Sequence, residues 1–309
     1  MEGLVVRASM GTGFRAPGLG DLAANTSFSA AYHYDYVKCS AQGISRADCS
    51  EDQVNTYISA NPNLGPETSE SANFGVIYTL GNHSLAIDWF STEIDGVITS
   101  ISVQDIIDAS ILGASYSATL TAQGAYCDRN GTQADSGLQE CYTNPVNGNK
   151  LTVAGTDIKY SGLFETRVGD FDLNLGMVIM DESKSEAFYN GPVVNFVGLT
   201  STPEMRYSLD VGHTLQAVPN LSLSAQYEYI DALADSYSAD YVAIGSVSEW
   251  TQVNLRAVYV VPGIENLSIS LAVRNLGKED PPLNSSGEFN RALHSNLGMS
   301  TIFGFTLDL

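Results

Sequence analysis

Apolar and polar residues alternate along most of the chain with a period of two, which indicates β-strands. The clearest stretch is 221–229, where leucine, alanine and tyrosine alternate with serine, glutamine and glutamate. Four more stretches alternate as clearly, and five do so more weakly: 4–9, 205–211, 253–261 and 267–274, then 67–80, 84–101, 151–167, 171–180 and 297–309. The pattern predicts about ten strands, several of them long, and no stretch shows a convincing helical period.

The connectors between these strands alternate between long and short. The short connectors are 81–83, 168–170, 216–220 and 262–266. The long connectors are about 11–66, 104–149, 182–203, 231–249 and 278–294. In an antiparallel meander this alternation places every long connector at one end, as in outer-membrane barrels with short periplasmic turns and long extracellular loops. The sequence therefore predicts an all-β, antiparallel transmembrane β-barrel.

Charged residues within the strands occupy the polar positions of the alternation. In a membrane barrel these positions line the lumen, while the apolar positions face lipid. The predicted lumen-facing polar residues are Arg7, Asp88, Arg206, Asp210, Glu228, Arg256 and Arg274. The aromatic residues predicted to face lipid, in interfacial girdles, are Tyr78, Trp89, Tyr160, Tyr207, Tyr227, Tyr229, Tyr259, Phe303 and Phe305. A soluble antiparallel sandwich would show the same alternation around a core, so strand length and connector asymmetry are what favour the barrel.

Composition narrows the class of protein further. The chain has 309 residues, with 14 Lys and Arg against 35 Asp and Glu, a net charge of −21. Nucleic acid is excluded as a partner because phosphate binding needs clustered cations. Residues 1–20 show no secretory signal pattern, and no run reaches the ~20 apolar residues of a membrane helix. A helical membrane protein is therefore excluded, whereas a barrel is not.

The four cysteines form two pairs that are close in sequence, Cys39 with Cys49 and Cys127 with Cys141. These spacings are longer than the C-x₂₋₄-C spacing of zinc sites and suit two local disulfides in loops. Each disulfide would stabilise the fold by about 3 kcal/mol in the chain-entropy model. The pairing rests on proximity alone, with free thiols as the alternative, and it implies an oxidising compartment.

Motifs for catalysis, cofactors and metals are incomplete. Residues 11–16, GTGFRA, match the glycine pattern of a dinucleotide-binding turn, but Pro17 and Gly18 follow where a helix is needed. The four histidines are scattered, and the acidic clusters lack the register of a calcium loop. We therefore predict no catalytic residues, no cofactor and no metal site. Loop aromatics that either stack on a ligand or pack within the loops are Tyr32, Tyr34, Tyr36, Phe188 and Tyr189.

Three segments carry recognisable motifs. Residues 6–17 read VRASMGTGFRAP, residues 61–69 read NPNLGPETS, and residues 273–282 read VRNLGKEDPP. In the same order and with similar spacing, they resemble three motifs of the TonB-dependent outer-membrane receptors: R-A-S-y-G-t-G-F-R-A-P, N-P-x-L-x-P-E-x-S and v-x-N-L-F-D-x-D-P-P. The resemblance spans essentially the whole chain. Departures are Gly277-Lys278-Glu279 in place of F-D-x and Leu309 in place of a terminal aromatic residue.

The resemblance implies that residues 1–309 are the C-terminal part of a 22-stranded, plugged barrel, without the plug domain and the first strands. It implies energised import of a scarce, bulky ligand (a metal chelate, a cobalamin-like cofactor or an oligosaccharide) across the outer membrane of a Gram-negative bacterium. The implied partners are outer-membrane lipid and lipopolysaccharide, an unidentified small ligand, and the TonB energy-coupling complex through the missing plug. We expect no transport by the chain alone, because open sheet edges are not tolerated in hydrocarbon.

Two alternatives remain from the sequence. One is a soluble β-sandwich that serves as a binding or adhesion module. The other is an autonomous ten-stranded outer-membrane barrel, possibly a hydrolase, which would need paired acids and a histidine at the extracellular rim. His33 and His294 lie near long connectors, but neither has an acidic partner at a fixed spacing.

Overall fold

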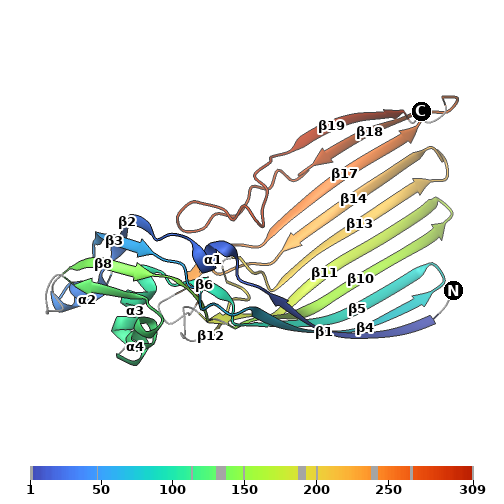
Figure 1. The fold of residues 1–309 in the computed structure, drawn as a ribbon. Helices are drawn as coiled ribbons and strands as arrows, with labels where there is room; N and C mark the ends of the chain where they lie inside the picture. Colours follow the sequence, from blue (N-terminus) through green and yellow to red (C-terminus); the bar gives the residue numbers. More distant parts are fainter. Residues whose placement is uncertain are drawn as a thin grey trace.

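A computed structural model describes residues 3–46, 48–112, 114–129, 137–148, 150–186, 193–199, 201–237, 243–264 and 267–307. Its main feature is one curved sheet (Figure 1). Ten long strands follow one another across it: β1 (Gly3–Arg15), β4 (Glu67–Leu80), β5 (His83–Asp95), β10 (Leu151–Thr166), β11 (Gly169–Glu186), β13 (Met205–Leu215), β14 (Leu221–Ile230), β17 (Trp250–Val260), β18 (Leu267–Arg274) and β19 (Ser300–Leu307). A short strand, β12 (Val193–Asn195), pairs with β11. The prediction of about ten strands is confirmed.

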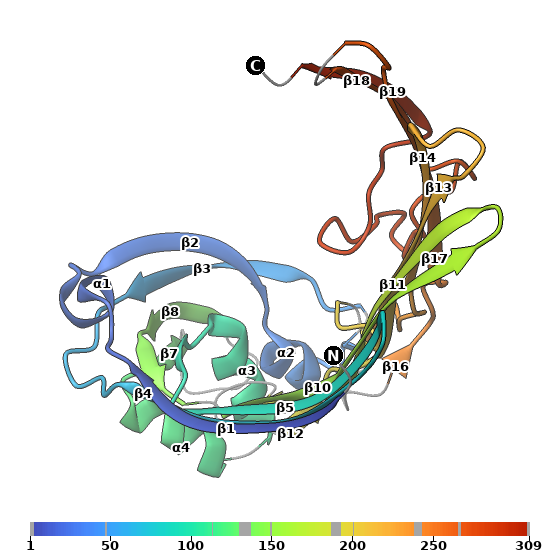
Figure 2. The same ribbon diagram turned by 90° about the vertical axis from the view of Figure 1, so that its right-hand side faces the viewer.

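The long strands form an antiparallel meander, in which each strand pairs with the long strands before and after it in the sequence. Figure 2 shows that the sheet bends into an arc and does not close on itself. In the part of the chain that the structure describes, β1 pairs only with β4, and β19 only with β18. The sheet therefore has two open edges, one along β1 and one along β19.

The short connectors all lie at one end of the main sheet, and the long ones lie at the other (Figure 1). At the turn between β10 and β11, Gly169 has φ +134°, and a Cβ built there would lie 2.0 Å from the backbone oxygen of Thr214. Only glycine fits this position, because any side chain would collide with the next strand. The expected separation of turns and loops is present in the fold.

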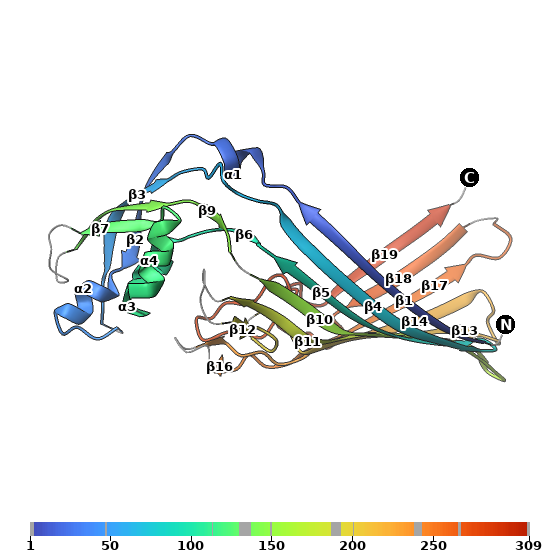
Figure 3. The ribbon, with the colours of Figure 1, turned by 60° about the horizontal axis from the view of Figure 1, so that its bottom comes forward.

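The two longest connectors fold together into one body, which we call the loop unit (residues 16–66 and 97–147). It contains α1 (Leu19–Ala23), β2 (Ser27–Tyr34), α2 (Tyr36–Ala41), β3 (Glu51–Ile58), β6 (Ile98–Ser100), α3 (Val103–Leu112), α4 (Ala114–Ala122), β7 (Tyr126–Arg129), β8 (Leu138–Thr143) and β9 (Pro145–Asn147). Strands β2, β3, β8 and β7 form a small sheet in that order, with β3 and β8 parallel, while β6 pairs with β9. Figure 3 shows helices α2, α3 and α4 together on one side of this body.

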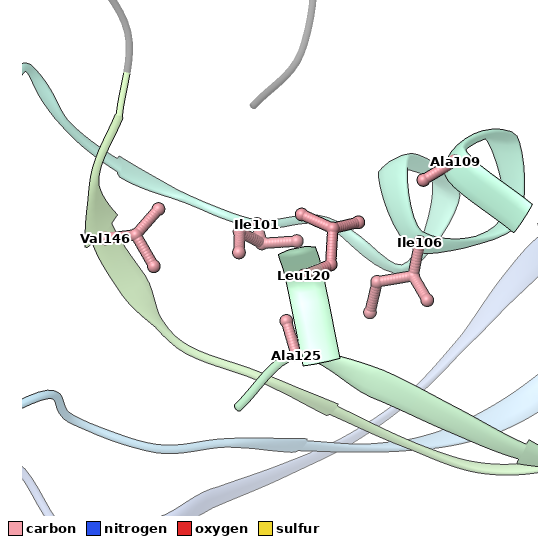
Figure 4. Packing of buried hydrophobic residues seen from close by; sticks show 6 residues of the cluster. All are labelled: Ile101, Ile106, Ala109, Leu120, Ala125 and Val146. Atoms are coloured by element: carbon pink, nitrogen blue, oxygen red, sulfur yellow. The ribbon is translucent and has the colours of Figure 1, made fainter. Parts of the chain in front are cut away.

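Most of the buried apolar residues lie in the loop unit rather than in the main sheet. One cluster joins helices α3 and α4 to the β6–β9 pair: Ile101, Ile106, Ala109, Leu120, Ala125 and Val146 (Figure 4). A second cluster joins the small sheet to α3 through Val54, Val103, Ile107 and Cys141. The loop unit therefore has a hydrophobic core of its own.

The loop unit contains helices, although no stretch of the sequence shows a convincing helical period. Helix α3 carries apolar residues at the helical spacing, Val103, Ile106 and Ile107, but over ten residues only. Helix α4 alternates apolar or small residues with serine and threonine at a period of two, so its sequence lacks the apolar stripe of a helix. Strand bounds also differ: β1 extends to Arg15 into the predicted loop, and the strand expected to end at residue 101 ends at Asp95. Two further short strands, β15 (Ser236–Tyr237) and β16 (Ala243–Ile244), form a hairpin within the connector after β14.

The main sheet is a single layer, which contradicts the sandwich alternative. Large apolar side chains remain exposed on it; Phe303 is 78% and Phe305 84% exposed. A soluble sandwich would bury such residues against a second sheet, and the described residues contain no second sheet in that place. No described helix is long and apolar enough to cross a membrane.

Candidate functional site: the polar face of the main sheet

Cross-strand register places the polar strand positions on one face of the main sheet. Directly paired residues share a face, and Arg7 pairs with Gly75, Gly75 with Asp88, and Asp88 with Asp157. Following the pairs across the sheet brings all seven predicted residues to this face, which we call the polar face: Arg7, Asp88, Arg206, Asp210, Glu228, Arg256 and Arg274.

The opposite face, the apolar face, carries the aliphatic and aromatic positions. All nine aromatic residues named from the sequence fall on it: Tyr78, Trp89, Tyr160, Tyr207, Tyr227, Tyr229, Tyr259, Phe303 and Phe305. Near the short turns, His83 and Phe164 make an edge contact at 4.8 Å, and Phe171 stacks on His213 at 4.0 Å. These two histidines therefore pack among aromatic rings at the turn end of the sheet.

An ion pair crosses the polar face near β1. The Arg7 guanidinium donates through Nε to Asp88 Oδ1 at 2.7 Å and through Nη2 to Asp88 Oδ2 at 2.5 Å. Arg7 lies on β1 and Asp88 on β5, so the pair spans the intervening strand β4 above Gly75. A Cβ at position 75 would lie 1.7 Å from Asp88 Oδ1, so the contact requires glycine there.

Three cavities follow one another along the polar face. The first, of about 580 Å³, is lined by Arg7, Asp88, Asp157 and Lys159, among others. The second, of about 420 Å³, reaches from Lys159 to Asp210. The third, of about 600 Å³, brings together the predicted residues Arg206, Glu228 and Arg274. The structure thus brings Arg7 and Asp88 together in the first cavity, while Asp210 lines the second. Arg256 lines none of these three but a separate cavity of about 410 Å³ beside Ser224.

Amide side chains form the floor of the third cavity. Asn254 Nδ2 donates to Gln226 Oε1 at 3.0 Å, and Gln252 Nε2 donates to Asn254 Oδ1 at 2.8 Å. Within the described part of the chain, the guanidinium groups of Arg206 and Arg274 donate no hydrogen bond, although both residues line the cavity. Two guanidinium groups with free donors beside an amide floor suit an oxygen-rich ligand or protein segment.

One buried asparagine anchors the segment 276–299 over this cavity. Asn275 is 1% exposed with φ +51°, a left-handed conformation that asparagine tolerates. Its Nδ2 donates to the backbone oxygens of Glu279 (2.9 Å) and Leu297 (3.2 Å), and its Oδ1 accepts from Glu279 N at 2.8 Å. Figure 2 shows the segment on the inner side of the arc, so the polar face is the concave one.

A tryptophan of β17 packs against a histidine of the same segment. The rings of Trp250 and His294 meet edge to face at 5.7 Å, and both residues are buried. Trp250 Nε1, beside the cavity, and His294 Nδ1 have no hydrogen-bond partner in the structure. Burial lowers the pKa of the His294 imidazole below its usual value, although a backbone hydrogen bond to Asn290 opposes this.

Two of the sequence motifs meet where the main sheet joins the loop unit. Arg15 donates through Nε (2.7 Å) and Nη2 (2.5 Å) to the buried carboxylate of Glu67. Glu67 also accepts from the backbone N of Ile98 at 2.8 Å. Asn147 then accepts from Gly65 N at 2.7 Å and donates to the backbone oxygens of Gly65 and Gly96. These bonds hold the loop unit against the ends of β1, β4 and β5.

Both predicted disulfides are present, Cys39–Cys49 and Cys127–Cys141, and they lie in the loop unit. Of the predicted loop aromatics, Tyr34 stacks on Tyr36 at 5.6 Å and Tyr32 is exposed. Phe188, Tyr189 and Leu309 lie outside the described residues.

Sequence reasoning missed several residues of these cavities. Asp157 and Lys159 lie in a strand whose alternation is weak, and Trp250 begins a strand that was expected at 253. The segment 293–297 carries no motif, and only the fold brings it to the sheet. In the part of the chain that the structure describes, no group of three or more His, Cys, Asp or Glu side chains is placed to hold a metal ion.

One family model and several solved structures are similar to this chain. The family model described as "TonB dependent receptor-like, beta-barrel" matches residues 1–276. The ferric enterobactin receptor PfeA of Pseudomonas aeruginosa is similar in structure at 16% identity and TM-score 0.61, over 98% of this chain and 38% of that one. The siderophore receptor PirA of Acinetobacter baumannii is similar at 12% identity and TM-score 0.61, over 98% and 39%.

A third similar structure is the copper transporter OprC, at 13% identity and TM-score 0.52, over 98% of this chain and 36% of that one. At these identities the likeness shows the fold alone. The chain spans less than two fifths of the length of each of these structures. A search of curated proteins gives no match.

Proposed function

We propose that this chain, which belongs to the TonB-dependent receptor β-barrel family, forms the C-terminal part of the barrel wall of an energised outer-membrane receptor. The observation that carries the proposal is the division of one curved sheet into a concave polar face and an exposed apolar face. Such a division suits a wall with lipid outside and an aqueous lumen inside.

The open edges support the same proposal. Strands β1 and β19 leave backbone groups unpaired along their outer sides in the described residues. Within hydrocarbon each unsatisfied backbone group costs several kcal/mol, so membrane sheets close into barrels. We infer that further strands of the same receptor complete the barrel along both edges, and that the chain alone does not transport.

The ligand in this proposal is a scarce, bulky solute, such as a metal chelate. The similar structures are those of a ferric enterobactin receptor, a siderophore receptor and a copper transporter. In this chain, the cavity with Arg206 and Arg274 offers guanidinium donors that suit oxygen-rich groups. Energy would come from the TonB complex acting on a plug domain outside this chain, in the outer membrane of a Gram-negative bacterium.

An uptake assay tests the proposal in cells that carry the complete receptor gene. Metal-starved cells with and without the gene are given radiolabelled ferric enterobactin and, separately, radiolabelled copper, before and after a protonophore removes the proton gradient. We expect gene-dependent accumulation of at least one probe that stops with the protonophore, while binding at the cell surface persists. Gene-dependent flux that is insensitive to the protonophore would show a passive pore and refute the proposal.

A further inference from the structure

Four aromatic rings cross the small sheet of the loop unit in a single row. Phe28 on β2 pairs with Tyr57 on β3, Tyr57 with Tyr142 on β8, and Tyr142 with Tyr126 on β7. Their ring centroids are 5.6, 5.2 and 4.9 Å apart in that order. We call this set the aromatic row; it contributes one ring from each strand of the sheet.

The aromatic row lies on the face of the small sheet that faces away from the core. Residues of the opposite parity, Val54, Thr56 and Cys141, are buried against helix α3 and the disulfide. On the row's own face, Phe28 is 60% and Tyr126 36% exposed. The two inner rings, Tyr57 and Tyr142, are half-buried between them. Large rings are usually buried in a soluble unit, so a row with two exposed ends marks an interaction surface.

Acidic and amide side chains form the next row on the same face. Asn55 pairs with Glu140 and Glu140 with Asp128, directly beside the aromatic row, and Glu51 follows at the end of β3. Among the described strand positions of the small sheet, the single cation is Arg129, which lies beyond a register shift in β7 and donates to the buried carboxylate of Asp35. The loop unit as a whole has ten Asp and Glu against three Lys and Arg. The face is therefore aromatic and negatively charged.

The loop unit already holds one cation by this chemistry. The Arg46 guanidinium lies 4.0 Å from the ring centroid of Tyr36, which stacks on Tyr34 of strand β2. The same guanidinium donates to Asp108 at 3.2 Å. A ring face and a carboxylate together thus bind an arginine within this unit, as cation–π and charge-assisted contacts predict.

We propose that this face of the small sheet is a docking surface for an arginine- and lysine-rich segment of a partner polypeptide. The carboxylates of Glu51, Asp128 and Glu140 would pair with the cations, while Phe28 and Tyr126, each with one ring face free of a neighbour in the row, would receive guanidinium groups or apolar stems. The charge of the face excludes an anionic occupant. This function is separate from uptake through the barrel.

The test measures binding of a fluorescent nona-arginine peptide to the detergent-purified complete receptor by fluorescence anisotropy. The variant Asp128→Asn/Glu140→Gln removes a cross-strand acidic pair from the face. The matched control, Glu165→Gln/Asp170→Asn, removes an equivalent cross-strand pair from β10 and β11 at the turn end. Both variants change the net charge equally, and both keep the shape of the side chains.

We expect the loop-unit variant to weaken binding about tenfold, since two exposed charge contacts are lost, and the control to leave it unchanged. A third variant, Phe28→Ser, should weaken binding without any change of charge. Equal losses in the loop-unit and control variants would show adsorption to net charge and overturn the proposal. Unchanged binding in the loop-unit variant, or binding of a neutral dextran oligosaccharide in place of the peptide, would also overturn it.

Discussion

Replacing Asn275 with alanine should release the segment 276–299 from the polar face while leaving the main sheet intact. The side chain makes three hydrogen bonds to the backbone and is 1% exposed. Losing three net hydrogen bonds costs roughly 1.5–4.5 kcal/mol, and placing alanine at φ +51° adds about 1 kcal/mol. The expected total of about 3–5 kcal/mol favours local opening of the segment and raises its open population by about two to four powers of ten.

Two companion variants separate the contributions. Asn275→Gly accepts the left-handed conformation and loses only the hydrogen bonds, so it should open the segment about fivefold less than alanine does. Asn275→Asp keeps the acceptor for the backbone N of Glu279 but removes both donor contacts. The assay is hydrogen exchange with mass spectrometry on the purified receptor. Unchanged exchange across 276–299 in the alanine variant would refute the anchoring role of Asn275.

Three further predictions concern the loop unit and the same segment. Asp35 is fully buried, and its carboxylate accepts hydrogen bonds from both Nη atoms of Arg129 at 2.8 Å. Arg129→Met would leave that charge buried without its partner, so it should destabilise the loop unit by about 3–5 kcal/mol. Near-ultraviolet circular dichroism on heating measures this loss. Adding Asp35→Asn should restore part of that loss; a double variant as unstable as the single one would contradict this. Reducing both disulfides should speed proteolysis in the loop unit before the main sheet is cut, since each contributes about 3 kcal/mol. The folded state lowers the pKa of His294 below its value of 6.5 in the unfolded chain. The stability that the neutral imidazole contributes is therefore complete above pH 6.5 and is lost as the pH falls through the pKa of the folded state. Exchange of 276–299, corrected for intrinsic rates, should thus rise below about pH 6.5 in the wild type and stay flat in His294→Phe; equal pH dependence in both would contradict the role of His294.

The main sheet was predictable because the sequence patterns that specify each strand lie within that strand. Each long strand alternates within itself, and the lengths of the connectors fix the order of the strands and the position of the loops. The face of each charged residue then follows from parity, which the register of Arg7, Gly75 and Asp88 illustrates. The disulfide pairs were equally local, with each pair close in sequence.

The loop unit was not predictable, because its contacts are distant in sequence. Strand β3 pairs in parallel with β8, so that Asn55 meets Glu140 across a separation that no sequence period reveals. The helices are short and gain their stability from that packing rather than from propensity. Trp250 and His294 likewise meet only because Asn275 turns the chain back over the sheet.

The division between a concave polar face and an exposed apolar face is tested most directly by spin labels at neighbouring positions of β14. Cysteine replaces Ser224 or Ala225, which adjoin in sequence and point to opposite faces; the four native cysteines are in disulfides and leave no free thiol. In receptor reconstituted into lipid vesicles, the label at 225 should collide with dissolved oxygen, which concentrates in lipid. The label at 224 should instead be shielded from oxygen or reached by a water-soluble nickel chelate. Equal oxygen contact at both positions, or the reverse pattern, would contradict the proposed barrel wall.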